Sequence, residues 1–265
     1  MKKIPKVLVI AGSDSCGGAG LQADLKVLAL HDVYTATIIS CLTAQNTQKV
    51  YAVHEMPLDF LRQQIAVILD DIEFDVIKIG MLASLEIIEV IADELFKKSL
   101  NIPIILDPVM VATSGDILLQ KNAIESLKNK LLCKAFLTTP NINEAEILAN
   151  MKIRNLNEMK DSAVKIKGLG VGAVLIKGGH LNFEDNKIHN LLLDQNNNFH
   201  IITNDKIAIE NIHGTGCSLA SAISANIAKK MDLLLACQLA NQFIFNAVKN
   251  YQIVGKGSAV LGMKF

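Results

Sequence analysis

The sequence contains no tryptophan, and only 5% of its 265 residues are aromatic. It therefore lacks the side chains on which proteins stack the bases of single-stranded nucleic acids. It also lacks a net charge, because 26 lysines and arginines balance 26 aspartates and glutamates. Without a basic excess, bulk electrostatics cannot hold nucleic acid or an anionic membrane surface. We expect neither nucleic acid nor a membrane among the partners.

Long apolar runs are missing too, although hydrophobic residues make up 51% of the chain. Polar residues interrupt every uncharged stretch before it provides the roughly 20 mainly apolar residues that a bilayer needs. The apolar run at residues 7–11 is too short for a signal peptide. The five cysteines are odd in number and form no C-x-x-C pair, so we expect no disulfide framework or zinc site. A reducing cytoplasm is the predicted location.

Short strand-like runs alternate with helical patterns along the chain. Strands are predicted at residues 7–11, 35–41, 76–79, 104–106, 136–139, 173–176, 187–193 and 199–203, and residues 50–56 are predicted as a short strand or an edge flap. Helices are predicted at residues 22–30, 58–70, 85–96, 123–132, 143–149, 156–169, 217–229 and 233–251. This alternation predicts an α/β fold with a mostly parallel central sheet and helices on both faces. We find no repeat and no linker, and we predict one domain over residues 1–265.

Polar or glycine-bearing segments follow several of the predicted strands. In an open parallel sheet, ligands bind beyond the carboxyl ends of the strands. The convergence of these segments therefore predicts a ligand site more strongly than any one of them. They are residues 12–20, 44–47, 80–81, 107–108, 141–144, 177–179 and 213–217.

Residues 213–217 read His-Gly-Thr-Gly-Cys, and a helix is predicted immediately after them. The glycines allow backbone N–H groups to turn inward, and these groups together with the helix N-terminus favour an anion. A thiol at such a helix start is expected to have a lowered pKa, so Cys217 is a candidate proton acceptor. The alternative is a turn, a tightly packed helix and an inert buried cysteine.

A glycine-rich loop at residues 12–20 follows the first predicted strand. It is not a P-loop, because no Gly-Lys-Ser/Thr ends it. Residues 18–23 match G-x-G-x-x-A, but no acidic residue ends the second strand to bind a ribose, and we do not expect a Rossmann cofactor site. Asp24, in the following helix, is a candidate for contact with a substrate hydroxyl. Its alternative role is stabilisation of the helix dipole.

Gln45 follows a predicted buried strand, in a segment that reads Ala-Gln-Asn-Thr. Its amide offers both a donor and an acceptor, which suits a heteroaromatic ring that carries an amine beside a ring nitrogen. The alternative is an amide that closes its own turn.

Two acidic residues and a lysine also stand at strand ends. Asp107 and Glu144 are candidates to organise hydrated Mg²⁺, which keeps several waters and takes few carboxylates. Asn141 also predicts a helix cap with Glu144 at its third position, a variant of the capping box. Lys177 is a candidate to neutralise a transferring phosphate, and the alternative is an ordinary solvated lysine.

Together these segments resemble the hydroxymethylpyrimidine/phosphomethylpyrimidine kinase family of thiamine biosynthesis, part of the ribokinase superfamily. The resemblance runs in order across nearly the whole chain, through residues 12–20, 107–115, 140–144, 177–179 and 213–217. It implies a ribokinase-like fold and phosphorylation that depends on ATP and Mg²⁺. The implied acceptors are 4-amino-5-hydroxymethyl-2-methylpyrimidine and then its monophosphate. Cys16 departs from the pattern, because the family usually has glycine there.

The resemblance also implies roles for single residues. Gln45 matches the residue that binds the pyrimidine, while Asp24, Met81 and Val109 match other parts of the pocket. Asn141 and Glu144 match the superfamily's Asn-x-x-Glu motif, which tunes the metal and the phosphates. Superfamily members often form dimers, which implies a homodimer, and a flexible lid is expected near residues 114–116.

The mechanism that these parts predict is centred on Cys217, where many superfamily sugar kinases carry aspartate. In this hypothesis Cys217 removes or orients the proton of the substrate hydroxyl. The N–H groups of Gly214, Thr215 and Gly216 stabilise the transferring phosphoryl group, and Lys177 and Mg²⁺ share its charge.

Two other functions stay open at this point. One is pyridoxal kinase, which belongs to the same superfamily and in some members also carries cysteine at the position of Cys217. The other is a catalytically silent metabolite-binding protein on the same fold. The presence of a candidate base, an anion loop and a metal carboxylate argues against the second.

Overall fold

The computed structural model describes residues 4–97, 101–110, 119, 121–181, 185–209 and 212–263, except for the side chains of residues 121 and 180. In chain order, the first half contains β1 (Lys6–Asp14), α1 (Gly20–Leu30), β2 (Tyr34–Gln45), β3 (Val50–Glu55), α2 (Leu58–Asp71), β4 (Val76–Ile79), α3 (Leu85–Lys97), β5 (Ile104–Leu106), α4 (Lys121–Ser126), η1 (Leu127–Leu131) and η2 (Leu132–Lys134). The second half contains β6 (Leu137–Thr138), α5 (Ile142–Ala149), α6 (Leu156–Lys167), β7 (Ala173–Ile176), η3 (Gly178–His180), β8 (Lys187–Leu193), β9 (Phe199–Asp205), β10 (Ile212–His213), α7 (Thr215–Ala228), α8 (Leu233–Lys249) and β11 (Ala259–Val260).

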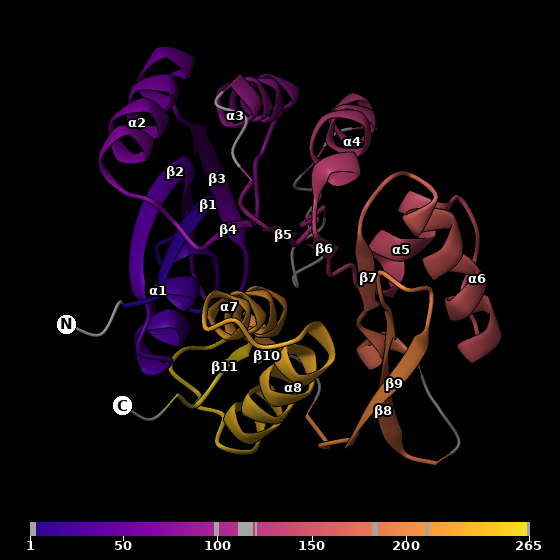
Figure 1. The fold of residues 1–265 in the computed structure, drawn as a ribbon. Helices are drawn as coiled ribbons and strands as arrows, with labels where there is room; N and C mark the ends of the chain where they lie inside the picture. Colours follow the sequence, from indigo (N-terminus) through magenta and orange to yellow (C-terminus); the bar gives the residue numbers. More distant parts are fainter. Residues whose placement is uncertain are drawn as a thin grey trace.

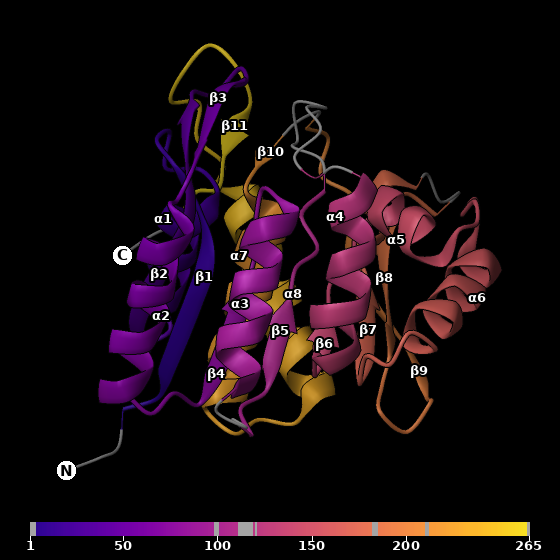
Figure 2. The same ribbon diagram turned by 90° about the horizontal axis from the view of Figure 1, so that it is seen from above.

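In the described part of the chain, nine strands form one sheet in the order β3-β2-β1-β4-β5-β6-β7-β8-β9. The six strands from β2 to β7 in this order are parallel. The edge strand β3 runs antiparallel to β2, and the β8–β9 hairpin joins β7 in the antiparallel sense. A separate parallel pair, β10 with β11, lies next to the carboxyl ends of the central strands (Figure 2).

Helices cover both faces of this sheet (Figure 1). Alternate side chains of β1 point to opposite faces, so Leu8 and Ile10 belong to one core while Val7 and Val9 belong to the other. The first core is closed by α2, α3, α4, α5 and α6, and the second by α1, α7 and α8. Near-continuous apolar strands are needed because both faces are buried.

The predicted α/β fold with a mostly parallel sheet is confirmed, and most element boundaries differ from the predictions by three residues or fewer. The predicted helix at 123–132 is α-helical only to Ser126 and then widens into the π-helical turn η1. The two-residue strands β10 and β11 were not predicted, because apolar periodicity is not visible over two positions. No helix in the described residues is long and apolar enough to cross a membrane.

Candidate active site

The loop after β1 and the segment that leads into α7 touch at the carboxyl end of the sheet. Gly214 has a φ of +87°, which favours glycine, and a Cβ there would overlap the carbonyl oxygen of Gly18. A Cβ on Gly216 would lie 3.1 Å from Nζ of Lys177 and 3.7 Å from Oδ2 of Asp107. The structure therefore brings together four of the segments that the sequence indicated.

Cys217 is the third residue of α7 and the last residue of the predicted anion loop. The expectation of a lowered pKa is wrong for the ligand-free protein, because burial raises the pKa of this thiol to about 11. Lys78 offsets part of the effect of burial, while the carboxylates of Asp24 and Asp107 add to it. At neutral pH the thiol therefore carries its proton.

Beneath this thiol lies a buried ion pair that the sequence analysis missed. Nζ of Lys78 in β4 donates to Oδ2 of Asp24 in α1 at 2.8 Å, and both side chains are fully buried. Oγ of Ser221 in α7 donates to the other carboxylate oxygen at 2.7 Å. Burial alone would lower the pKa of Lys78, but the Asp24 carboxylate outweighs it and raises that pKa. The pair thus joins the sheet to α1 and α7, two of the helices that cover this face.

This position changes the interpretation of Asp24. Asp24 lies in the second turn of α1, whose first turn has no acidic residue, so the alternative role at the helix dipole does not apply. Both carboxylate oxygens already accept hydrogen bonds within the protein. Contact with a substrate hydroxyl stays a prediction, and it would require exchange with one of these partners.

Lys177 is not an ordinary solvated lysine. Its Nζ donates to Oδ1 of Asp107 at 2.9 Å and lies 4.0 Å from Oε2 of Glu144. Burial alone would lower the pKa of Lys177, but the two carboxylates raise it. For Glu144, burial outweighs the attraction of Lys177, repulsion by Asp107 adds to it, and the pKa rises to about 7. One cation thus faces two buried acids, which leaves room for a second positive charge.

The capping box predicted at Asn141 and Glu144 is present. Oδ1 of Asn141 accepts from the Glu144 backbone N–H at 2.9 Å, and Oε2 of Glu144 accepts from the Asn141 N–H at 2.8 Å. The backbone of Asn141 also bridges to that of Lys177 on the neighbouring strand. Helix capping and the placement of Glu144 beside Lys177 therefore come from the same contacts.

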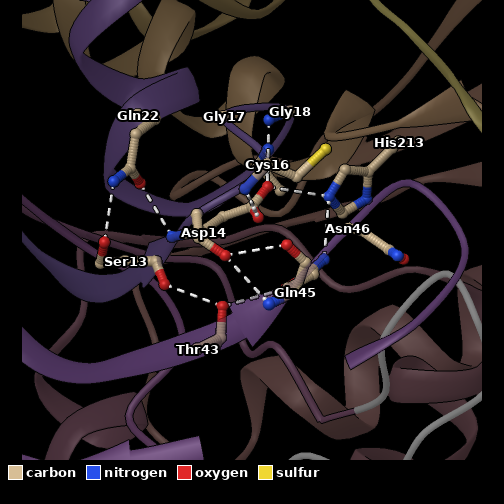
Figure 3. A network of polar contacts seen from close by, with 12 residues as sticks. Ser13, Asp14, Cys16, Gly17, Gly18, Gln22, Thr43, Gln45, Asn46 and His213 are labelled. Atoms are coloured by element: carbon tan, nitrogen blue, oxygen red, sulfur yellow. Dashed lines mark hydrogen bonds and ion pairs between the residues drawn. The ribbon is translucent and has the colours of Figure 1, made fainter. Parts of the chain in front are cut away.

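Gln45 lies at the end of β2, and its side chain does not close its own turn. Figure 3 shows it between Thr43 and His213, with its terminal atoms 3.2 Å from the Thr43 hydroxyl and 3.1 Å from Nε2 of His213. The neighbouring Asn46 closes the turn instead, by accepting from two backbone N–H groups. A hollow of about 550 Å³ opens at Gln45, and its lining includes Ser15, Cys16, Asn46, Thr47 and Lys256.

The remaining predicted pocket residues lie around the same strand ends. Met81 packs near the first loop, since a Cβ on Gly12 would lie 3.4 Å from its sulfur. Val109 is half-buried, and its N–H donates to the carbonyl of Asp107 at 2.9 Å. The lid expected near residues 114–116 lies outside the described residues, as does the last part of the 107–115 segment.

The sequence held a signal for Lys78 that the analysis did not use. The strand reads Val-Ile-Lys-Ile, and a lysine in a strand buried on both faces requires an acidic partner. Asp14 and His213 were named only as members of their loops. Their contact joins residues 199 positions apart, which no local pattern indicates.

Comparison with known proteins gives a consistent result. The profile of the phosphomethylpyrimidine kinase family matches residues 14–261. The chain is 41% identical over 254 residues to the hydroxymethylpyrimidine/phosphomethylpyrimidine kinase of Bacillus subtilis, covering 96% of this chain and 93% of that one. It is 40% identical to the thiamine biosynthetic bifunctional enzyme TH1 of Arabidopsis thaliana, covering 99% of this chain but only half of that longer protein.

Solved structures with the same fold include two vitamin kinases. An ADP complex of Bacillus subtilis pyridoxal kinase matches with a TM-score of 0.88 and 32% identity, over 98% of this chain and 97% of that one. A phosphomethylpyrimidine kinase from Clostridium difficile matches with a TM-score of 0.81 and 37% identity, over 93% and 100% of the two chains.

The buried ion pair allows a prediction about stability. Asp24→Asn or Lys78→Met leaves one charge buried without its partner, and each is expected to lower the free energy of unfolding by about 3–5 kcal/mol. The double variant is expected to lose less than the sum of the two single losses, because it buries no unpaired charge. Urea denaturation followed by circular dichroism measures all three.

Lys230→Met is the matched control, because Lys230 pairs with Asp75 at 3.0 Å but its side chain is 72% exposed. An exposed pair contributes about 0–1 kcal/mol, so this variant should unfold near the wild-type midpoint. Strictly additive losses in the double variant would show that Lys78 and Asp24 are not coupled.

Proposed function

Because the chain belongs to the phosphomethylpyrimidine kinase family, we propose that it transfers the terminal phosphoryl group of ATP to the hydroxyl of 4-amino-5-hydroxymethyl-2-methylpyrimidine, and then phosphorylates the resulting monophosphate, in thiamine biosynthesis. One observation carries the proposal. Lys177 and Asp107 form an ion pair at the strand ends beside Gly216, which belongs to the five-residue segment 213–217 that also holds Cys217. A base, an anion loop and charge-balancing groups are what phosphoryl transfer requires.

The groups have separable tasks. Cys217 accepts or orients the hydroxyl proton while the hydroxyl oxygen bonds to the γ-phosphorus and the bond to the ADP oxygen breaks. The N–H groups of Gly214, Thr215 and Gly216 are free to meet the negative oxygens, because the first N–H groups of a helix have no partner within it. Lys177 balances the charge that moves to the leaving ADP.

Asp107 and Glu144 fit the Mg²⁺ that the family implies. They are buried carboxylates that share a single lysine, and Mg²⁺ in phosphoryl-transfer sites is typically held by one or two carboxylates together with phosphates and waters. Oε2 of Glu144 already accepts from the Asn141 N–H, so Glu144 is better placed to hold waters of the ion than the ion itself. When bound, the ion would neutralise charge on the phosphates.

Pyridoxal kinase is the second candidate, because a pyridoxal kinase shares this fold with a TM-score of 0.88. A coupled assay of ADP release with hydroxymethylpyrimidine and with pyridoxal separates the two functions. The proposal requires a higher kcat/KM on the pyrimidine. Preference for pyridoxal would replace it with the second candidate.

A homodimer, a single domain over residues 1–265 and residence in a reducing cytoplasm are further parts of the proposal. All five cysteines are free thiols, as a reducing location allows. The edge strand β3 supports a dimer, because its residues from Tyr51 to Glu55 are all exposed and include Val53, which is 41% exposed. An edge strand with exposed apolar side chains is a surface that a second copy can cover.

Cys217→Ala is expected to lower kcat by about 10²–10⁴-fold with substrate still bound, the usual contribution of a positioned acid or base. Cys133→Ala is the matched control, because Cys133 lies in η2, away from the site. A kcat near the wild-type value in Cys217→Ala would contradict the assignment of Cys217.

The pH profile distinguishes proton removal from orientation. Since the pKa of the free thiol is about 11, the thiolate fraction rises tenfold per pH unit below that value. If the thiolate removes the proton, kcat/KM should rise with pH, and Cys217→Asp, whose carboxyl has an ordinary pKa several units below that of the thiol, should not show this rise over the same range. A flat wild-type profile would instead assign Cys217 to orienting the hydroxyl.

Gln45→Ala should weaken binding of the pyrimidine and leave the KM for ATP unchanged. Loss of two hydrogen bonds, at about 1 kcal/mol each, corresponds to an increase of about 30-fold in the KM of the pyrimidine. Gln242→Ala, on the exposed side of α8, is the control. Equal loss for both ligands would contradict the role of Gln45.

Val53→Lys is expected to convert a dimer into a monomer, measured by sedimentation velocity, because it places a charge in the apolar surface of β3. Val67→Lys, on α2, is the control, since Val67 is exposed to a greater extent but lies on a helix. A wild-type protein that sediments as a monomer at high concentration would contradict the dimer.

A further inference from the structure

Nε2 of His213 lies between a partner that needs a hydrogen-bond donor and a partner that needs a hydrogen-bond acceptor. It is 3.0 Å from Oδ2 of Asp14 and 3.1 Å from Nε2 of Gln45, with the amide placed as in Figure 3. A single ring nitrogen either donates a hydrogen or accepts one. It cannot donate to the carboxylate and at the same time accept from the amide.

Asp14 decides between these two states. Its carboxylate accepts from the backbone N–H groups of Cys16, Gly18 and Ala19, at 2.8, 3.0 and 2.8 Å. Burial alone would raise the pKa of Asp14, but the hydrogen bonds from His213 and from the backbone outweigh it and lower that pKa. An ionised carboxylate only accepts, so Nε2 of His213 must carry the hydrogen.

Thr43 likewise determines which atom of the Gln45 amide can form a hydrogen bond on its other side. Its hydroxyl donates to the carbonyl of Ser13 at 2.9 Å, which uses its only hydrogen. The atom of Gln45 that lies 3.2 Å from the Thr43 oxygen therefore meets a lone pair. Only the amide nitrogen can make a hydrogen bond there.

We infer that His213 and Thr43 fix the Gln45 amide with its oxygen toward Nε2 of His213 and its nitrogen toward the Thr43 hydroxyl, so that these two residues determine which heteroaromatic ring the site accepts. The oxygen and nitrogen of a glutamine amide are assigned from the hydrogen bonds around them. With oxygen toward Thr43, both contacts would join like groups. A half-turn of the amide pairs each atom with a complementary partner.

The surroundings hold this arrangement in place. The hydroxyl of Ser15 donates to the Gln45 carbonyl at 2.8 Å and accepts from its N–H at 2.9 Å, which fixes the backbone. The ring of His213 packs directly on Gly18, where a Cβ would lie 2.5 Å from its Cδ2. His213 and Asp14 are only 8% and 2% exposed, so little water competes for their hydrogen bond.

An amide in a fixed orientation accepts only one arrangement of donor and acceptor on the ligand ring. His213 and Thr43 occupy the two flanks of the amide, which leaves one oxygen lone pair and one N–H at its tip. These suit an amine beside a ring nitrogen, and they repel a ring in which a carbonyl and an N–H take those places. A freely turning amide would accept both rings. This step rests on the proposed function, which supplies the aminopyrimidine.

Kinetics on paired substrates test the inference. The probes are the aminopyrimidine alcohol and its oxo analogue, with a carbonyl and a ring N–H in place of the amine and ring nitrogen. In Thr43→Val and in His213→Phe, the ratio of kcat/KM for the amine over the oxo compound should fall about tenfold, as expected for loss of one orienting hydrogen bond. The KM of the amine should rise.

The matched controls are Thr203→Val and His200→Asn. Thr203 contacts a histidine, and His200 contacts a carboxylate. Both contacts lie in the β8–β9 hairpin. Both should keep the wild-type ratio. A loss in Thr43→Val or His213→Phe that is equal for the two substrates would mean a merely structural role and would overturn the inference.

Nitrogen NMR of the ligand-free protein tests the orientation without any assay of activity. With ¹⁵N in histidine and in glutamine side chains, Nε2 of His213 should carry the hydrogen and show no coupling to the Gln45 amide nitrogen. A coupling across the hydrogen bond between these two nitrogens, or a ring protonated at Nδ1 alone, would overturn the inference. Because this measurement needs no turnover, it separates failure of the orientation from failure of the proposed kinase activity.

Discussion

The ion pair between Lys78 and Asp24 is the constraint on which the site depends. A lysine buried in a central strand cannot remain charged without a partner, and the carboxylate that pairs with it comes from α1. Ser221 brings α7 to the same carboxylate, so α1 and α7, two of the helices that cover this face of the sheet, are tied to one charge. The loops at the start of α1 and of α7 meet as a consequence, and the thiol of Cys217 lies above the pair.

The sequence predicted what depends on neighbouring residues. Apolar runs such as residues 76–79 predicted strands, because a strand buried on both faces must be apolar at every position. The exception is a position where a buried charge has a partner of opposite charge. The glycine-bearing loops and the capping box at Asn141 were predicted because turn and cap chemistry act over a few positions. The family resemblance then implied roles for Gln45 and Cys217 in one site, although they are far apart in the chain.

What escaped prediction depends on pairing across the fold. Lys78 and Asp24 are 54 positions apart, and Asp14 and His213 are 199 apart, so no window of sequence contains either pair. The pKa of Cys217 shows the same limit in another form. A helix N-terminus stabilises a negative charge by about 0.3–1 kcal/mol, less than one pKa unit. Burial instead raises the pKa of Cys217 to about 11, a larger effect in the opposite direction, and the nearby acidic groups that add to it are placed by the tertiary structure.

The segment 213–217 connects the proposed ring-binding part of the site with the proposed phosphoryl-transfer part. Its first residue, His213, contacts Gln45, the proposed ring-binding side chain, and its last, Cys217, is the proposed partner of the reacting hydroxyl. Between them, Gly214 packs against the carbonyl of Gly18, so the loop after β1 cannot shift without moving both ends. A ring seated in the wrong direction at Gln45 would therefore carry its hydroxyl away from Cys217. In the proposed function, recognition of the ring and alignment of the hydroxyl thus depend on the same short segment of backbone.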